Sequence, residues 1–187
     1  MARTEVLFNP ERLRALRDTA LVGSAWEEAF DRLARVASVA LHAPVALVCF
    51  VEADRQFFKS CVGLDTERTS SLAYSFCQHV VDRAGPLVVH DASTHLLVAQ
   101  NRAHVELGMR AYLGVPLTTS DGQTIGSFCV MDREERAWTD EHLAVMTDLA
   151  ASVMTEIALR AQARLLVTKE LTFQSTLERQ HEFLSAV

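Results

Sequence analysis

Hydrophobic residues concentrate in two runs late in the chain, residues 111–117 and 125–131, and the polar tetrapeptide 120–123 (Ser-Asp-Gly-Gln) lies between them. An Asp-Gly step between apolar segments is a strong hairpin signal, because the turn needs positive φ angles that glycine adopts easily. Both runs are too apolar for either face to lie in water. The pattern therefore predicts two central antiparallel strands that are covered on both faces.

Three further strands are predicted upstream, at residues 45–51, 55–62 and 87–90. The first is apolar and rich in β-branched residues, which is typical of a buried strand. The second mixes apolar and polar residues on both faces, which indicates a position nearer to the edge of the sheet.

Helical spacing of apolar residues predicts four helices before the hairpin. The first starts at Pro10, behind a loosely attached arm at residues 1–9, and the second covers residues 25–41 with Ser24 as its N-cap. The third is capped by Ser70 or Ser71, and the fourth covers residues 94–107 with a cap at Asp91 or Ser93. The stripe expected to face the core in the second helix consists of Trp26, Ala29, Phe30, Leu33, Val36, Ala37 and Ala40.

A last helix is predicted to begin after Thr139, because neither proline nor glycine occurs from there to the end of the chain. Its apolar residues follow a heptad-like seam that Arg160 and Arg164 interrupt, and the seam then resumes in a shifted register. We expect residues 161–187 to project from the domain and pair with a second helix. The residues assigned to this dimer helix are Leu143, Met146, Val153, Ile157, Leu166, Phe173, Leu177 and Leu184.

Charge and composition narrow the classes of partner. A net charge of −6 without any run of Lys and Arg disfavours nucleic acid and anionic membranes. No continuous apolar stretch reaches the roughly 18 residues of a membrane span, and the first residues do not resemble a signal peptide. We therefore expect a cytoplasmic protein without nucleic-acid or membrane partners.

No catalytic or metal-binding motif is found in the sequence. The four cysteines, Cys49, Cys61, Cys77 and Cys129, form neither a CxxC pair nor a zinc-ligand spacing, so buried, reduced thiols are expected. No carboxylate pair, phosphate-binding glycine loop or nucleophile elbow occurs. The sequence thus predicts a domain that is not an enzyme, with no metal and no evident cofactor.

Five sequence blocks resemble the GAF domains of bacterial sensor kinases, diguanylate cyclases and serine phosphatases. They are DRQFFKS (54–60), SFCQH (75–79), PLVVHDA (86–92), YLGVPL (112–117) and IGSFCVMD (125–132). Their order and spacing are more specific than any single block, and the resemblance covers roughly residues 22–160.

The resemblance implies an α+β fold with an antiparallel sheet, in which the five strands numbered along the chain have the order 2-1-5-4-3. Helices from both ends of the chain would cover one face, and lid helices would enclose a ligand pocket on the other. The chain would divide into an N-terminal arm and helix (1–21), the GAF domain (22–160) and a signalling helix (161–187). That helix would lead to a following PAS, kinase, cyclase or phosphatase domain, as in two-component systems.

The family architecture places the candidate pocket between the lid and the central strands. Its candidate lining residues combine apolar walls with a few polar groups: Tyr74, Phe76, Cys77, His79, Asn101, Tyr112, Ser127 and Cys129. The sequence leaves open whether the odd-numbered or the even-numbered residues of the strand at 125–131 face the lid. It also leaves open whether these side chains simply fill the space, as in GAF domains that only dimerise.

The implied function is a sensory domain that binds a small molecule or a partner and relays this event through a dimeric helix to an effector. The chain lacks the Cys-His pair that attaches bilins and the Asn-Lys-Phe-Asp-Glu pattern of domains that bind cyclic nucleotides. His79 as a haem ligand or pH switch is less expected than a core histidine. The alternatives are a purely structural dimerisation domain and an enzyme similar to free methionine sulfoxide reductases, which would use Cys61, Cys77 or Cys129.

Overall fold

The computed structural model describes residues 5–65 and 67–185, with side chains as far as residue 179. The side chain of Leu184 therefore lies outside the described residues. The chain divides into two compact units, Met1–Met154 and Thr155–Val187, and each is described by itself below.

The first unit is built on a six-stranded antiparallel sheet with the order β3-β2-β1-β6-β5-β4. The strands are β1 (Val45–Val51), β2 (Arg55–Val62), β3 (Thr69–Ser71), β4 (Leu87–Val89), β5 (Ala111–Thr118) and β6 (Thr124–Asp132). The order of the five predicted strands is confirmed. The short polar strand β3 extends the sheet beyond β2 and was not predicted.

Strands β5 and β6 form the predicted hairpin, in register from Ala111 opposite Asp132 to Leu117 opposite Gly126, and the register shifts by one residue before Thr118 pairs with Thr124. Gly122 adopts a φ of 86° in the connecting turn, where the Gly122 amide donates to the Thr119 carbonyl. All nine residues of β6 are buried, as expected for a strand covered on both faces.

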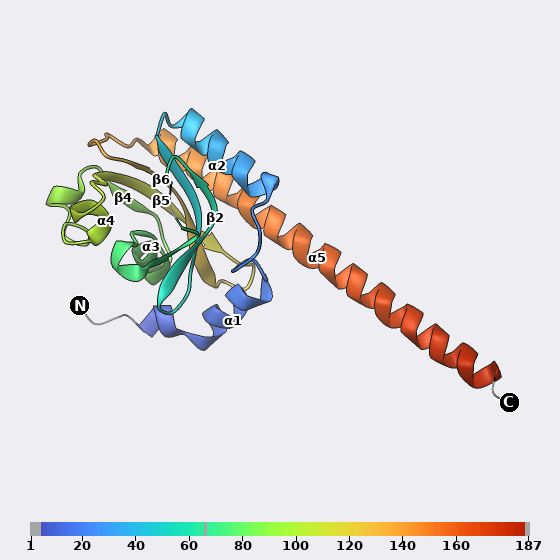
Figure 1. Cartoon of the computed structure of the whole chain (residues 1–187). Coiled ribbons are helices and arrows are strands. Elements are labelled where there is room, and N and C mark those ends of the chain that lie inside the picture. Colours follow the sequence, from blue (N-terminus) through green and yellow to red (C-terminus); the bar gives the residue numbers. More distant parts are fainter. Residues whose placement is uncertain (1–4, 66, 186–187) are drawn as a thin grey trace. The chain divides into compact units, whose positions relative to one another are not determined.

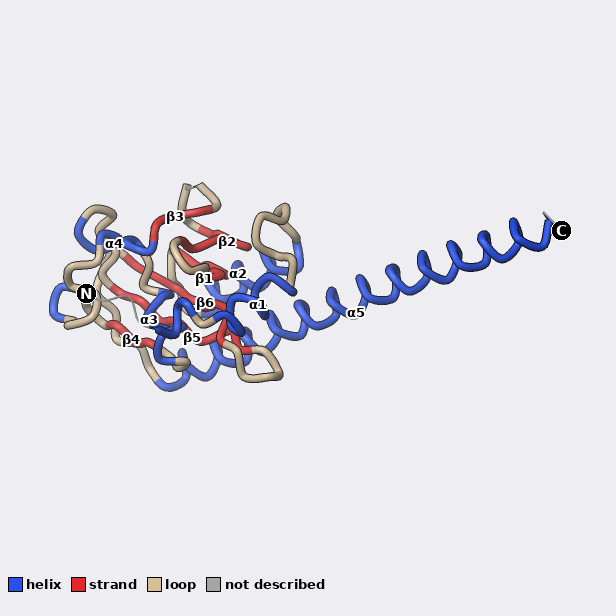
Figure 2. The backbone as a smooth tube through the Cα atoms, turned by 90° about the horizontal axis from the view of Figure 1, so that it is seen from below, coloured by secondary structure: helices blue, strands red, loops and turns tan. Residues whose placement is uncertain are grey.

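Two helical layers enclose the sheet. The helix α2 (Glu28–Ala40) and the first turns of α5 (Asp140–Ser185) lie on one side, and α3 (Cys77–Arg83) and α4 (Arg102–Val105) lie on the other (Figure 1). In the view from below, α3 and α4 again lie apart from α2 across the strands (Figure 2). This arrangement matches the fold implied by the resemblance.

The predicted start of the second helix is wrong, and its predicted core stripe is confirmed only for Phe30 and Ala37. Lys59 donates from Nζ to the hydroxyl of Ser24 at 2.8 Å and to the Ala25 carbonyl at 2.6 Å, so Ser24 does not cap a helix. Helix α2 begins at Glu28 instead. Its buried residues are Phe30, Ala34 and Ala37, whereas Trp26, Val36 and Ala40 of the predicted stripe are exposed.

The lid contains shorter helices than predicted. Ser71 caps the 3₁₀ helix η2 (Leu72–Tyr74), and α3 follows as a separate helix. Asp91 caps only the 3₁₀ helix η3 (Ala92–Thr94), and Asn101 caps α4. The predicted helix at 94–107 is therefore wrong over most of its length, because two polar side chains each start their own short helix.

The segment at residues 5–18 is folded, in contrast to the loosely attached arm that we expected at residues 1–9. It forms the 3₁₀ helix η1 (Glu5–Phe8) and the helix α1 (Pro10–Asp18), which Asn9 caps. The buried guanidinium of Arg12 donates to the carbonyls of Leu7 at 2.6 Å and Val51 at 2.7 Å. Arg12 thereby links this segment to the end of β1.

Helix α5 is continuous over 46 residues. Met146, Ala150, Val153 and Ile157 are buried, whereas Leu166, Phe173 and Leu177 are exposed. By length and composition alone, Asp140–Arg179 is apolar enough to cross a membrane, with a mean hydropathy of 1.3 and 22% of the apolar window buried. Core helices of soluble proteins meet the same criterion, so the absence of a membrane partner stays a prediction.

Candidate functional site

A pocket of about 480 Å³ lies on the lid side of the sheet in the first unit. Its volume is within the range of sites that bind small molecules, about 300–1,000 Å³. The lining residues are Leu47, Gln56, Phe58, Gly63, Leu64, Asp65, Ser70, Tyr74, Phe76, Cys77, Ala103, Leu107, Met109, Tyr112, Met131 and Arg133. Most of them are apolar, and they come from β1, β2, β3, η2, α3, α4, β5 and β6 with their connecting loops.

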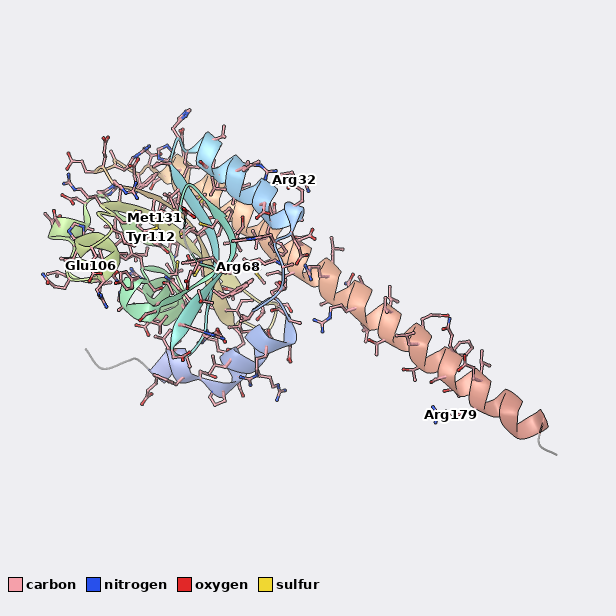
Figure 3. All side chains as sticks on the ribbon, viewed as in Figure 1. Arg32, Arg68, Glu106, Tyr112, Met131 and Arg179 are labelled. Carbon is pink, nitrogen blue, oxygen red and sulfur yellow. The ribbon has the colours of Figure 1, made fainter. Side chains whose placement is uncertain are left out.

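Four of the eight predicted pocket residues line this space: Tyr74, Phe76, Cys77 and Tyr112. Ser127 and Cys129 lie directly behind two of them, within contact of Tyr112 and Cys77. Figure 3 shows Tyr112 and Met131 on the sheet and Glu106 farther out on α4.

The other two predicted residues have different surroundings. Asn101 caps α4 and donates from Nδ2 to the Ser75 carbonyl at 3.0 Å, so it joins two lid segments. His79 is half-buried in α3, and burial lowers the pKa of its imidazole. Neither residue is among those that line the described pocket.

The structure answers which face of β6 meets the lid. Cys129 and Met131 belong to the buried cluster that also contains Phe76, Cys77 and Val80 of the lid. The odd-numbered residues of β6 therefore face the pocket side. Sequence alternation alone could not give this answer, because both faces of β6 are apolar.

Cys77 lies at the centre of a buried group of thiols and hydroxyls. Its Sγ is 3.8 Å from the Sγ of Cys129, and the Tyr112 hydroxyl donates to it at 3.5 Å. The Tyr112 hydroxyl oxygen is also 3.1 Å from Oγ of Ser127. The ring of Tyr112 lies where a side chain at position 114 would be, because a Cβ on Gly114 would come within 2.1 Å of the hydroxyl oxygen.

The environment separates the acidities of these thiols. Hydrogen bonds, first from the Cys129 thiol and also from the Tyr112 hydroxyl, lower the pKa of Cys77. Burial raises the pKa of both Cys49 and Cys129. Cys77 is therefore the thiol of this group that ionises most readily.

A polar cluster closes the rim of the pocket between η2 and α4. The Tyr74 hydroxyl donates to Oε2 of Glu106 at 2.5 Å, and Nε of Arg102 donates to Oε1 of the same carboxylate at 2.5 Å. The Arg102 guanidinium also lies 4.6 Å above the centre of the Tyr74 ring. These contacts hold the short helix α4 against η2.

The opposite wall is fixed by Gln56 of β2. Its Nε2 donates to Oγ of Ser70 in β3 at 2.8 Å, and its Oε1 accepts from the Cys49 thiol at 3.3 Å. Among the described residues, no group of three His, Cys, Asp or Glu side chains could hold a metal ion. The arrangement is suited to enclose a mostly apolar small molecule that has a few polar groups.

Sequence reasoning missed several lining residues, including Leu47, Phe58, Met109 and Met131. Leu47 and Met131 could have been found once the lid-facing side of the strands was known, because alternate residues share a face. Met109 has no such signal, since it lies in a loop whose path depends on the tertiary structure.

Known proteins resemble this chain both in sequence and in structure. A cyclic di-GMP phosphodiesterase of Pseudomonas aeruginosa is 32% identical over 133 residues, which cover 70% of this chain and 22% of that protein. The chain thus spans about a fifth of the length of this relative.

Two solved structures share the fold. A domain from a two-component sensor histidine kinase protein of Sinorhizobium meliloti gives a TM-score of 0.57 at 20% identity, covering 75% of this chain and 97% of that chain. Free methionine-R-sulfoxide reductase from Neisseria meningitidis, solved with its substrate, gives 0.61 at 17% identity, covering 87% and 96%. At these identities the likeness concerns the fold alone.

The family itself is established by the sequence. The model of the GAF domain matches residues 25–157, which is well over half of the chain. Together with the sheet order and the two helical layers, this match shows that the chain belongs to the GAF domain family.

Proposed function

We propose that this GAF domain is a non-catalytic sensor that binds a small molecule in the pocket under the lid and relays binding through a dimeric α5 helix. Membership of the GAF family and the relation to a bacterial cyclic di-GMP phosphodiesterase give the domain a sensory or regulatory role in bacterial signalling. The observation that carries the ligand part of the proposal is the pocket of about 480 Å³.

The pocket suggests the chemistry of its ligand. Leu47, Phe58, Met109 and Met131 offer apolar contacts and Gln56 offers polar ones, while the two charged lining residues, Asp65 and Arg133, are exposed and have opposite signs. A mostly uncharged molecule with one or two hydrogen-bonding groups would bury its apolar surface here without leaving a charge unpaired.

Ligand binding is tested by melting the protein against a library of small metabolites, with a variant that blocks the mouth of the pocket. Leu107 lines the pocket and is 48% exposed, so Leu107→Trp would fill the mouth without disturbing the core. Leu96→Trp is the matched control, because Leu96 is 97% exposed and is not a lining residue. A ligand that raises Tm in the wild type and in Leu96→Trp but not in Leu107→Trp supports the proposal. The same shift in all three proteins contradicts it.

The relay requires a dimer, which we propose forms through α5. Large apolar side chains are exposed along residues 159–177 of this helix, and a second copy of the chain would cover them. Biasing the register of such a helix pair is a common way to pass a signal to an attached domain. Light scattering after size exclusion on residues 1–187 and on a 1–160 truncation tests this step. A dimer that becomes monomeric on truncation supports the relay, and monomers in both cases contradict it.

The recipient of the signal would be an effector domain that follows this one, of the PAS, kinase, cyclase or phosphatase type. The match covers about a fifth of the Pseudomonas aeruginosa relative, so most of that protein lies outside the matched region. This coverage supports the proposal that a further domain is attached. We further propose a cytoplasmic location without nucleic-acid or membrane partners, in line with the net charge of −6.

A reductase acting on free methionine sulfoxide is the second candidate, favoured by the approach of Cys77 and Cys129 beside the pocket. An assay coupled to thioredoxin and NADPH, with Cys→Ser variants at positions 61, 77 and 129, separates it from the sensor. Turnover that depends on these cysteines would establish the enzyme, and the absence of turnover rejects it. A domain that neither binds a ligand nor turns over substrate, yet dimerises, would be the structural alternative.

A further inference from the structure

Two of the four cysteines, Cys77 and Cys129, lie in contact with each other beside the pocket. Cys77 begins α3 in the lid, Cys129 lies in the middle of β6, and their sulfurs are 3.8 Å apart although the residues are 52 positions apart in sequence. A disulfide requires an S–S distance of about 2.05 Å, which small side-chain rotations can provide from this starting distance.

The two thiols differ in their access to solvent. Cys77 lines the pocket and its side chain is only 3% exposed, whereas Cys129 is fully buried and is not a lining residue of the described pocket. A reagent that enters the pocket therefore meets Cys77 first. The donors that surround its sulfur, the Cys129 thiol and the Tyr112 hydroxyl, stabilise a thiolate there.

We propose that Cys77 and Cys129 form an oxidant-sensitive dithiol, in which a small uncharged hydroperoxide enters the pocket, oxidises Cys77 and is followed by closure of a Cys77–Cys129 disulfide. The proposal deepens the sensor function and rests on it in one respect, namely that the pocket admits small molecules. In bacterial cytoplasm, disulfides that do form are mostly transient and sensing or catalytic ones.

The chemistry balances in two steps. The Cys77 thiolate attacks the distal oxygen of the hydroperoxide, so an S–O bond forms and the O–O bond breaks. The sulfur loses two electrons to the hydroperoxide, which leaves as an alcohol or water after taking up a proton. The Cys129 sulfur then attacks the Cys77 sulfenic acid, an S–S bond forms, and hydroxide leaves as water with the thiol proton of Cys129.

The surroundings favour a small neutral oxidant over a large charged one. The walls next to Cys77 are apolar and aromatic, with Phe76, Met109 and Tyr112 among them. Glutathione disulfide is bulky and charged, and a residue that is only 3% exposed offers it little access. Closure of the disulfide would fix the start of α3 to the central strand β6, and so would couple oxidation to the position of the lid.

The experiment uses the full chain, reduced and desalted, and then treated with a small excess of hydrogen peroxide. Peptide mapping after thiol alkylation should show a Cys77–Cys129 cross-linked pair that has lost two hydrogens, with Cys49 and Cys61 still alkylated. Cys77 should react faster than Cys61, because the donors around its sulfur favour the reactive thiolate. Burial raises the pKa of Cys61, although this residue is more exposed than Cys77.

Variants sharpen the assignment. Cys129→Ser should stop the reaction at a Cys77 sulfenic acid that dimedone traps, and Cys61→Ser should behave like the wild type. Should a Cys→Ser variant fail to fold, the map of the wild-type protein decides alone. Oxidation of Cys61 with Cys77 and Cys129 left free overturns the proposal, as does a Cys77–Cys49 link or an equally fast reaction with glutathione disulfide.

Failure of this inference differs from failure of the sensor function. A ligand that raises Tm through the pocket, in a protein that forms no disulfide with hydrogen peroxide, rejects the dithiol alone. If the disulfide forms but no ligand raises Tm, only the part of the sensor proposal that concerns reversible binding is rejected.

Discussion

Gly114 and Tyr112 show how one missing side chain shapes the site. The two residues share a face of β5, and the Tyr112 ring occupies the space that a Cβ at position 114 would need. From there its hydroxyl reaches both Cys77 and Ser127. Because an added Cβ would come within 2.1 Å of that hydroxyl oxygen, Gly114→Ala should displace the ring and destabilise the fold by about 1–3 kcal/mol.

Urea unfolding of a double-mutant cycle measures this coupling. Tyr112→Leu removes the ring tip, so the cost of Gly114→Ala should fall well below its value in the wild-type background. Equal costs in the two backgrounds would show that strand geometry, and not the tyrosine, requires glycine at this position.

Lys59 is the residue whose protonation should influence stability most clearly. Burial and, second to it, the charge of Arg68 lower the pKa of Lys59 to about 8 from 10.5. Between these two pH values the unfolded chain binds more protons than the folded one, so the free energy of unfolding should rise with pH. Below pH 8 both states carry the charge and this contribution has no slope.

The comparison with Lys59→Met isolates this effect. We expect the midpoint of urea unfolding to increase from about pH 7 to about pH 9.5 in the wild type relative to the variant, because only the wild type loses a buried charge in that window. Parallel curves for the two proteins would mean that the Lys59 ammonium is fully compensated by its acceptors, Ser24, Ala25 and Glu27.

At the scale of elements, the sequence predicted what depends on long apolar runs and missed what depends on single polar contacts. The hairpin at residues 111–131 was predicted because both its strands and its turn carry strong local signals. The bounds of the strand β2 were predicted as 55–62, but the facing of its residues was not, because a bulge at Lys59 interrupts the alternation. Lys59 and Ser60 both face α2, through Phe30 and Asp31, and Cys61 packs against the lid-side cluster.

The lid is the element where a local change should be visible without a global one. Glu106 accepts hydrogen bonds from Tyr74 and Arg102, so Glu106→Gln removes the charge that joins η2 to α4. We expect faster amide hydrogen exchange across residues 101–108 and an unchanged unfolding midpoint, because the side chains of Glu106 and Arg102 are exposed and Tyr74 keeps its apolar contacts. Asp121→Asn in the β5–β6 turn is the control and should leave exchange in the lid unaffected. Unchanged lid exchange in Glu106→Gln would show that the apolar contacts alone hold α4.

At the scale of the molecule, the candidate pocket could be predicted only in part. The family resemblance named the correct side of the sheet, and half of the residues that it named line the pocket, since lid sequences such as SFCQH mark their own position. The remaining residues come from separate strands and loops, and their convergence follows from strand register and from the bulge in β2. The contact between Cys77 and Cys129 could not be predicted either, because no spacing in the sequence encodes it.

The C-terminal part of α5 carries the last prediction. Leu159, Leu166 and Phe173 recur every seven residues and are exposed, which is the pattern of a helix that pairs with another helix. Phe173→Glu would place two like charges opposite each other in a homodimer and remove apolar area worth about 1.5–3 kcal/mol. Because 1.4 kcal/mol corresponds to a tenfold change, we expect the dimer Kd to rise at least about tenfold.

Leu171→Glu is the matched control, because Leu171 and Phe173 are both 61% exposed but Leu171 lies outside the seam. Light scattering over a dilution series of the full chain should therefore separate the two variants. If both lose the dimer equally, exposed apolar area rather than heptad register holds the copies together. A register-based relay would then have no basis, because a helix pair without a defined seam cannot pass one of two discrete states to a following domain.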